Sequence, residues 1–184
     1  MGIDPADRQV LEFIPVHNEA QIAAVAQLAG EIWPEHYLSI IGQAQVDYML
    51  ARFQSSAAIA EQLRSGAEYF LLRQGQQYLG YAAVCIERET SSLFVSKLYL
   101  HRAARGRGLG RAAMNQLAHL ARRHGLSKLW LTVNKHNPAR LAYLRMGFIT
   151  VAEIVTDIGD GYVMDDYKME WTPAAAAAAA NSNQ

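Results

Sequence analysis

Apolar residues recur every three or four positions from Ile22 to Ile32, a spacing that is typical of an amphipathic helix. Asn18 stands where a capping residue is expected, and Gln21, three positions later, completes a capping box. Pro34 lacks the backbone N–H that a helix interior needs, so this helix is predicted to end there. The residues that follow, 35–37, are then expected in a loop.

Two shorter helices are predicted over 43–53 and 56–65, and Gly66 stops the second one. Beyond Gly66 the pattern changes to the period of two that is typical of strands. Strands are expected over 11–16, 68–73, 77–87, 93–100, 128–133, 149–158 and 162–171, with further helices over 108–124 and 138–146. This order predicts an α/β fold built on a mixed central sheet flanked by helices.

The chain has 184 residues, 51% of them hydrophobic, and a formal net charge of zero, which suits one globular domain. We expect that domain over 11–171, after a loose start at 1–10 and before an alanine-rich tail at 172–184. No apolar run approaches the roughly 20 residues of a membrane helix, and the first residues do not resemble a signal peptide. The sequence therefore favours a protein without membrane segments.

The single cysteine, Cys85, excludes an internal disulfide framework and fits a reducing, cytoplasmic setting. It lies within an apolar, strand-like run. We expect it to be a small buried hydrophobic residue rather than a nucleophile, because no histidine neighbours it in the sequence.

The charges are distributed unevenly along the chain. Eleven Lys and Arg residues lie between Lys97 and Arg145 with no acid among them, whereas six acids and one lysine lie between Glu153 and Glu170. The basic middle of the chain should attract a polyanion. Nucleic acid would meet that need, but no helix-turn-helix, zinc-ligand or base-stacking pattern supports it.

Three glycines, at 106, 108 and 110, follow the strand expected over 93–100 and lead into a helix. Glycine permits tight turns and leaves backbone amides uncovered, and a helix N-terminus adds positive potential, so this loop favours a phosphate. Arg102, Arg105, Arg107 and Arg111 surround it. The spacing matches neither the dinucleotide fingerprint G-x-G-x-x-G nor a P-loop.

The loop resembles the acetyl-CoA signature of the GCN5-related N-acetyltransferases, the GNAT family, over Arg105-Gly-Arg-Gly-Leu-Gly110. A second block, Asn137-Pro-Ala-Arg-Leu-Ala-Tyr-Leu-Arg-Met-Gly-Phe148, is similar to a block of the same family. The resemblance implies a largely antiparallel acyl-CoA N-acyltransferase fold. It also implies acetyl-CoA as co-substrate and the transfer of an acetyl group to an amine.

Roles for individual residues follow from this resemblance. Tyr143 would give a proton to the departing thiolate, because a tyrosine pKa near 10 lies above that of a thiol near 8.5. The end of the strand before the loop would pair with the pantetheine arm, and Asn137 would cap its helix and reach the cofactor. The residues implied for acetyl-CoA binding are Leu98, Tyr99, Leu100, Arg105, Gly106, Arg107, Gly108, Leu109, Gly110, Arg111 and Asn137.

The proton acceptor for the amine is left open by the sequence. A free alkyl amine is mostly protonated at neutral pH, so some group must remove a proton, directly or through water. Nothing in the pattern separates the candidates, which are Glu31, Glu35, His36, Glu87 and Glu89.

The acceptor itself is indicated only by charge. Acids cluster in the two segments that the family resemblance places beside the acceptor, namely Glu31, Glu35, Asp157, Asp160, Asp165 and Asp166. They favour a small cationic amine, with polyamines as the leading hypothesis. A peptide or protein amine, an aromatic amine and a non-enzymatic CoA-binding module are the alternatives, and Tyr143 argues against the last. The oligomeric state is open, with a homodimer as one hypothesis.

Overall fold

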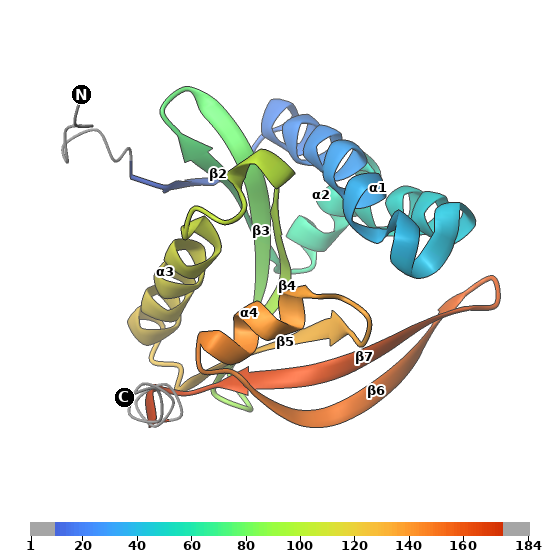
Figure 1. The fold of residues 1–184 in the computed structure, drawn as a ribbon. Helices are drawn as coiled ribbons and strands as arrows, with labels where there is room; N and C mark the ends of the chain where they lie inside the picture. The colour runs from blue at the N-terminus through green and yellow to red at the C-terminus, as the bar shows by residue number, and fades with distance from the viewer. Residues whose placement is uncertain (1–9, 175–184) are drawn as a thin grey trace, which may run out of the picture.

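A computed structural model describes residues 10–174, so most of the expected loose start (1–10) and tail (172–184) lies outside the described residues. Seven strands form one sheet in the order β1-β2-β3-β4-β5-β7-β6 (Figure 1). Every neighbouring pair is antiparallel except β4 with β5, which is parallel. The expected mixed, largely antiparallel sheet flanked by helices is confirmed.

The strands lie close to their predicted ranges. They are β1 (Glu12–Pro15), β2 (Glu68–Gln74), β3 (Gln77–Glu87), β4 (Ser92–Leu100), β5 (Lys128–Asn134), β6 (Ile149–Gly159) and β7 (Tyr162–Trp171). The helices are α1 (Glu19–Met49), a π-helical turn (Leu50–Gln54), α2 (Ser56–Arg64), a 3₁₀ turn (Arg102–Ala104), α3 (Leu109–Arg123) and α4 (Ala139–Arg145).

Helix α1 departs from its prediction. The capping box of Asn18 and Gln21 forms as expected, but Pro34 lies inside the helix and does not end it. Trp33 and Tyr37, on either side of the proline, are buried in the core beneath α1. That packing outweighs the local cost of the proline, so the predicted loop at 35–37 is wrong. The real interruption is Gly42, where φ is +79°.

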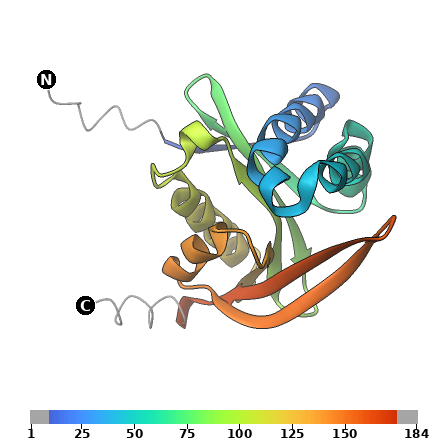
Figure 2. The same cartoon turned by 45° about the vertical axis from the view of Figure 1, so that its right-hand side comes forward.

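Helices cover both faces of the sheet (Figures 1 and 2). On one face α3 packs a stripe of apolar residues inward, namely Leu109, Ala113, Leu117 and Leu120. Helix α4 lies on the same side, and α1 and α2 cover the other face over a second core. None of the described helices is both long enough and apolar enough to cross a membrane.

The sheet opens between its two parallel strands. Backbone pairing of β4 with β5 covers only Ser92–Phe94 against Lys128–Trp130, although both strands continue further. In the pairing of β3 with β4, Ala83 faces Lys97 and Val84 faces Val95, which leaves Ser96 as an extra residue. Such a bulge bends and twists a strand. It lies where β4 and β5 part, so the rest of β4 has a free edge toward β5.

Cys85 is half-buried on β3, not fully buried as expected. Burial raises the pKa of its thiol, which keeps it protonated at neutral pH. A protonated thiol is a poor nucleophile, so the structural role predicted for this residue fits its surroundings.

Candidate functional site

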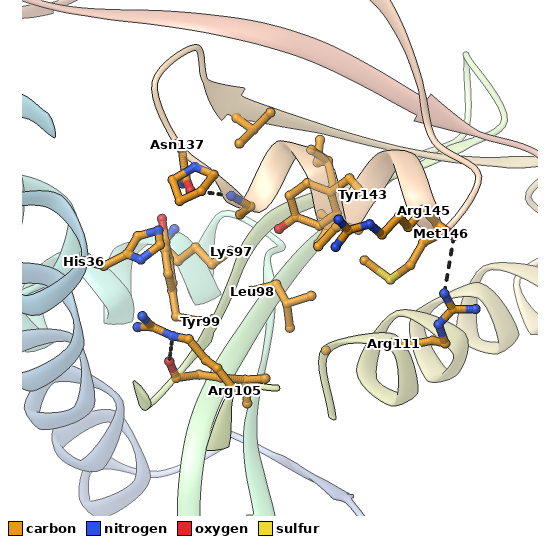
Figure 3. Close-up of a pocket in the computed structure, with 18 of the residues that line it drawn as sticks. His36, Lys97, Leu98, Tyr99, Arg105, Arg111, Asn137, Tyr143, Arg145 and Met146 are labelled. Carbon is orange, nitrogen blue, oxygen red and sulfur yellow. Dashed lines mark hydrogen bonds between the residues drawn. The ribbon is translucent and has the colours of Figure 1, made fainter. Parts of the chain in front are cut away.

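A cavity of about 500 Å³ occupies the gap between β4 and β5 (Figure 3). Its walls come from the free edge of β4, the facing part of β5, the glycine loop with the start of α3, α4 and the middle of α1. Residues more than a hundred positions apart therefore face one space. A site with walls from several elements can hold an extended ligand and separate its two ends.

Ten of the twelve residues that the sequence analysis assigned to the site line this cavity. They are Leu98, Tyr99, Leu100, Arg105, Gly106, Gly108, Gly110, Arg111, Asn137 and Tyr143. The other two point elsewhere. Arg107 donates a hydrogen bond to Oε1 of Gln74 over 2.8 Å, and the side chain of Leu109 is buried under α3. For Leu109, any contact with a ligand would have to come from its backbone.

The glycine loop has the geometry of an anion site. Gly106 and Gly108 adopt φ of +73° and +78°, which favour glycine, whereas Gly110 is already helical. Gly108 is the N-cap of α3, and no side chain caps the helix there. The first amides of a 15-residue helix are thus available to a ligand, with the positive end of the helix dipole behind them.

Two arginines are held beside this loop by contacts to the backbone. Nε of Arg105 donates to the carbonyl of Leu100 over 3.0 Å, and its Nη1 lies 3.3 Å from Oε1 of Glu35. Nη2 of Arg111 donates to the carbonyl of Arg145 over 3.3 Å (Figure 3). Positive charge therefore flanks the uncovered amides from the side of α1 and from the side of α4.

Tyr143 reaches the cavity from α4. The N-cap of α4 is Pro138 and not Asn137 as expected, but Oδ1 of Asn137 accepts a hydrogen bond from the N–H of Ala139 over 2.9 Å and so still satisfies an amide at the start of this helix. The Tyr143 ring packs edge-on against Phe148, and its hydroxyl faces the side where His36, Lys97 and Tyr99 lie (Figure 3). Burial raises the pKa of Tyr143, which keeps the phenol protonated and able to donate.

Of the five proton-acceptor candidates, His36 lines the cavity. Burial, helped by the charge of Arg105, lowers the pKa of His36, so its imidazole is neutral at pH 7. Glu31 pairs with His101 and Glu35 with Arg105. Glu87 lies at the opposite end of β3 and β4, where it accepts hydrogen bonds from Thr90, Ser92 and Trp130.

The acids expected beside the acceptor are mostly engaged by other groups. Asp165 forms an ion pair with Lys135 over 2.8 Å, and Asp157 accepts a hydrogen bond from the N–H of Gly159. Asp166 differs, because it is only 5% exposed and its Oδ1 has no hydrogen-bond partner. Burial raises the pKa of Asp166 to about 6, against the opposite effect of the Thr132 hydroxyl. Thr132 lines the cavity.

Among the cavity residues that the sequence did not assign to the site are Tyr37 and Lys97. Tyr37, expected in a loop, places its hydroxyl 3.4 Å from that of Tyr99. Lys97 donates a hydrogen bond to Oε1 of Gln62 over 2.7 Å, and burial lowers its pKa to about 8. A sequence signal for Lys97 existed, since it is a charged residue inside an otherwise apolar strand that leads into the glycine loop.

Comparison with known proteins agrees with this geometry. A model of the acetyltransferase (GNAT) family matches residues 23–148. Streptothricin acetyltransferase from Streptomyces lavendulae is 40% identical over 70 residues, which make up 38% of this chain and 37% of that protein. The matched segment thus spans little more than a third of this relative.

Solved structures share the fold at low sequence identity. A PaiA N-acetyltransferase from Thermoplasma acidophilum, solved with coenzyme A, has a TM-score of 0.72 at 17% identity, with 88% of this chain and 98% of that chain covered. A spermidine N-acetyltransferase SpeG chimera from Vibrio cholerae has a TM-score of 0.66 at 16% identity, with coverage of 93% and 98%. A ribosomal-protein-S18-alanine N-acetyltransferase from Escherichia coli has a TM-score of 0.64 at 16% identity, with 89% of this chain and 94% of that chain covered.

Proposed function

Because the chain belongs to the acetyltransferase (GNAT) family, we propose that it transfers the acetyl group of acetyl-CoA to a primary amine by direct attack. The observation that carries this proposal is the meeting of the glycine loop, the free edge of β4 and Tyr143 in one cavity. Cys85 is a free thiol, which is compatible with a reducing compartment, and we propose that the reaction takes place in the cytoplasm.

The donor would lie along the cavity with its phosphates at the loop. The amides between Gly106 and Gly110 would bind the pyrophosphate, with Arg105 and Arg111 neutralising its charge. From there the amide-bearing arm would follow Leu100, Tyr99 and Leu98. The unpaired backbone of β4 offers hydrogen bonds to it, as a sheet edge does to an added strand.

The reaction then needs proton removal from the acceptor nitrogen and proton donation to the departing sulfur. His36, neutral at pH 7, would take the proton of the incoming ammonium directly or through water. The neutral amine attacks the carbonyl carbon, the carbon–sulfur bond breaks and the nitrogen loses its second proton to water. Tyr143, which burial keeps protonated, would give its proton to the departing thiolate.

For the acceptor we propose a small cationic amine, with polyamines as the leading class. Two features support this. Asp166 supplies a buried carboxylate next to Thr132, and Tyr37 and Tyr99 give the cavity aromatic walls that favour cations. One similar structure is a spermidine acetyltransferase, but another acts on a protein alanine, so fold likeness does not choose between these acceptors.

A thiol-release assay tests both levels of the proposal. The full chain is given acetyl-CoA with spermidine, a mono-amine, an aromatic amine or a short peptide, each at low and high salt. The acetyltransferase proposal requires release of free CoA that depends on one of these amines, and a module that only binds CoA would release none. The polyamine proposal requires that kcat/KM is highest for spermidine and that its KM rises with salt. If the peptide is preferred at low salt, the acceptor class is wrong and the transfer reaction stands.

A further inference from the structure

Lys97 is a primary amine built into the cavity wall. It follows the bulge at Ser96, in the part of β4 that has a free edge toward β5. It directly precedes Leu98, so the proposed donor arm would end beside it. Figure 3 shows Lys97 on the same side of the cavity as His36 and Tyr99.

The groups around the Lys97 ammonium carry no negative charge. Its Nζ donates to Oε1 of Gln62 on α2 over 2.7 Å and lies 5.2 Å from the centre of the Tyr69 ring on β2. Cys85 on β3 is also close, and burial raises the pKa of its thiol. Within residues 10–174, Lys97 takes part in no ion pair, whereas Lys128, Lys135 and Lys168 each pair with an acid.

This environment makes Lys97 unusually reactive for a lysine. An unpaired, buried ammonium loses its proton more easily than an exposed one, and burial lowers the pKa of Lys97 to about 8. About half of the molecules therefore carry a neutral amine at pH 8, and only the neutral form is a nucleophile. The flexible four-carbon stem allows the nitrogen to leave Gln62 and turn toward the cavity.

We propose that Lys97 is an internal acetyl acceptor, so that the protein acetylates its own cavity wall when acetyl-CoA is present without an amine substrate. The inference rests on the proposed function. The Nζ lone pair attacks the thioester carbonyl, the carbon–sulfur bond breaks and the nitrogen loses a proton to His36 or water. The thiolate takes a proton from Tyr143, and the products are an acetylated Lys97 and free CoA.

Acetylation would change the acceptor side of the cavity. It replaces a cation with a neutral amide, which removes the charge that repels a cationic amine. It also adds an acetyl group to a wall beside the donor arm. The modification would therefore alter KM for a charged acceptor more than for a neutral one.

The test incubates the full chain with acetyl-CoA alone at pH 7 and pH 9, followed by intact mass measurement and peptide mapping. We expect a mass gain of one acetyl group on Lys97, faster at pH 9, with a first-order rate that does not depend on protein concentration. Excess CoA should suppress it by occupying the cavity. Lys128, Lys135 and Lys168 are the internal controls for chemical acetylation by the thioester.

Two variants make the result decisive. Lys97→Arg keeps the charge but is not acetylated, so the mass gain should disappear, and Lys97→Met serves if the arginine variant does not fold. Tyr143→Phe should slow the modification. Acetylation spread over Lys128, Lys135 and Lys168, or no label on Lys97 in a protein that acetylates added amines, would overturn the inference and leave the proposed function intact. An absence of both reactions would overturn both.

Discussion

Glu35 and Arg105 form an ion pair, Oε1 to Nη1 over 3.3 Å, that joins α1 to the glycine loop. The pair places a carboxylate beside the guanidinium proposed to meet the donor phosphates. Glu35 was expected to face a cationic acceptor, yet it contacts the donor side. The negative charge of Glu35, paired with Arg105, should therefore weaken binding of the donor phosphates.

Replacing Glu35 with Gln should tighten donor binding. The change removes a negative charge near the phosphate site, while Nε of Arg105 remains held by Leu100. We expect KM for acetyl-CoA to fall a few-fold at low salt and less at high salt, and stability to change by less than about 1 kcal/mol because the pair is partly exposed. Glu61→Gln, in an exposed pair on α2, is the matched control. Weaker donor binding would show that Glu35 positions Arg105.

Gly108→Ala should impair both folding stability and donor affinity. At φ of +78° a side chain costs roughly 1–2 kcal/mol, and the added methyl group lies in the wall of the cavity. Gly125→Ala carries a similar strain, at φ of +70°, beyond the other end of α3. Calorimetric titration with acetyl-CoA should show weaker binding only for Gly108→Ala. Equal affinities of the two variants would refute the anion site.

Tyr143→Phe should keep the fold and the donor affinity but lower kcat by about 10²- to 10⁴-fold, the usual effect of removing a positioned acid. The ring contact with Phe148 survives the change, because only the hydroxyl is lost. Steady-state thiol release measures kcat, and calorimetric titration measures the affinity for acetyl-CoA. A kcat within a few-fold of the parent would assign Tyr143 to packing alone.

His36 should control the acid limb of the pH profile. Its pKa lies below the ordinary 6.5, so the imidazole can accept a proton at neutral pH and loses this ability only as the pH falls below that value. We expect kcat/KM to stay level from pH 7.5 to about 6.5 and to fall in more acidic buffer. His36→Gln should abolish this limb and reduce kcat. His119→Gln, on the exposed face of α3, should leave the profile unchanged.

Lys97→Met should stabilise the fold at pH 7. The unfolded chain holds the Lys97 proton with a pKa of 10.5 and the folded chain with about 8, so stability rises with pH between these values. Below pH 8 the buried charge costs about 3 kcal/mol, from which the lost hydrogen bond to Gln62 subtracts about 1 kcal/mol. Urea unfolding should show a net gain of about 2 kcal/mol at pH 7 that is lost by pH 10. A gain of the same size at both pH values would exclude the charge as its cause.

Local signals in the sequence were sufficient for most of the fold. Alternating apolar residues located the strands, and Gly108 with its neighbours located the turn into α3, because strand period and glycine conformation are short-range properties. Pro34 shows the limit of this reasoning. Its local signal was clear, but the burial of Trp33 and Tyr37 comes from strands far along the chain.

Site residues can be predicted from the sequence where a motif specifies the local backbone shape. They cannot be predicted where their role depends on which distant parts of the chain the fold brings together. Arg105 and Tyr143 belong to such motifs and line one cavity. The candidate proton acceptors belong to no such motif. Only the folded chain distinguishes His36, which lies in the cavity, from Glu87, which lies at the far end of the sheet. Lys97 belongs to no motif, and a lysine in a strand is ordinary until its partners are known.

The parting of β4 from β5 gives the molecule two half-sheets, β1–β4 and β5–β7, that share three residue pairs of backbone bonding. The core beneath α3 includes residues of both half-sheets and holds them together on one face. A donor lying between the half-sheets would contact both of them. Donor binding would therefore couple the two half-sheets as well as supply the acetyl group.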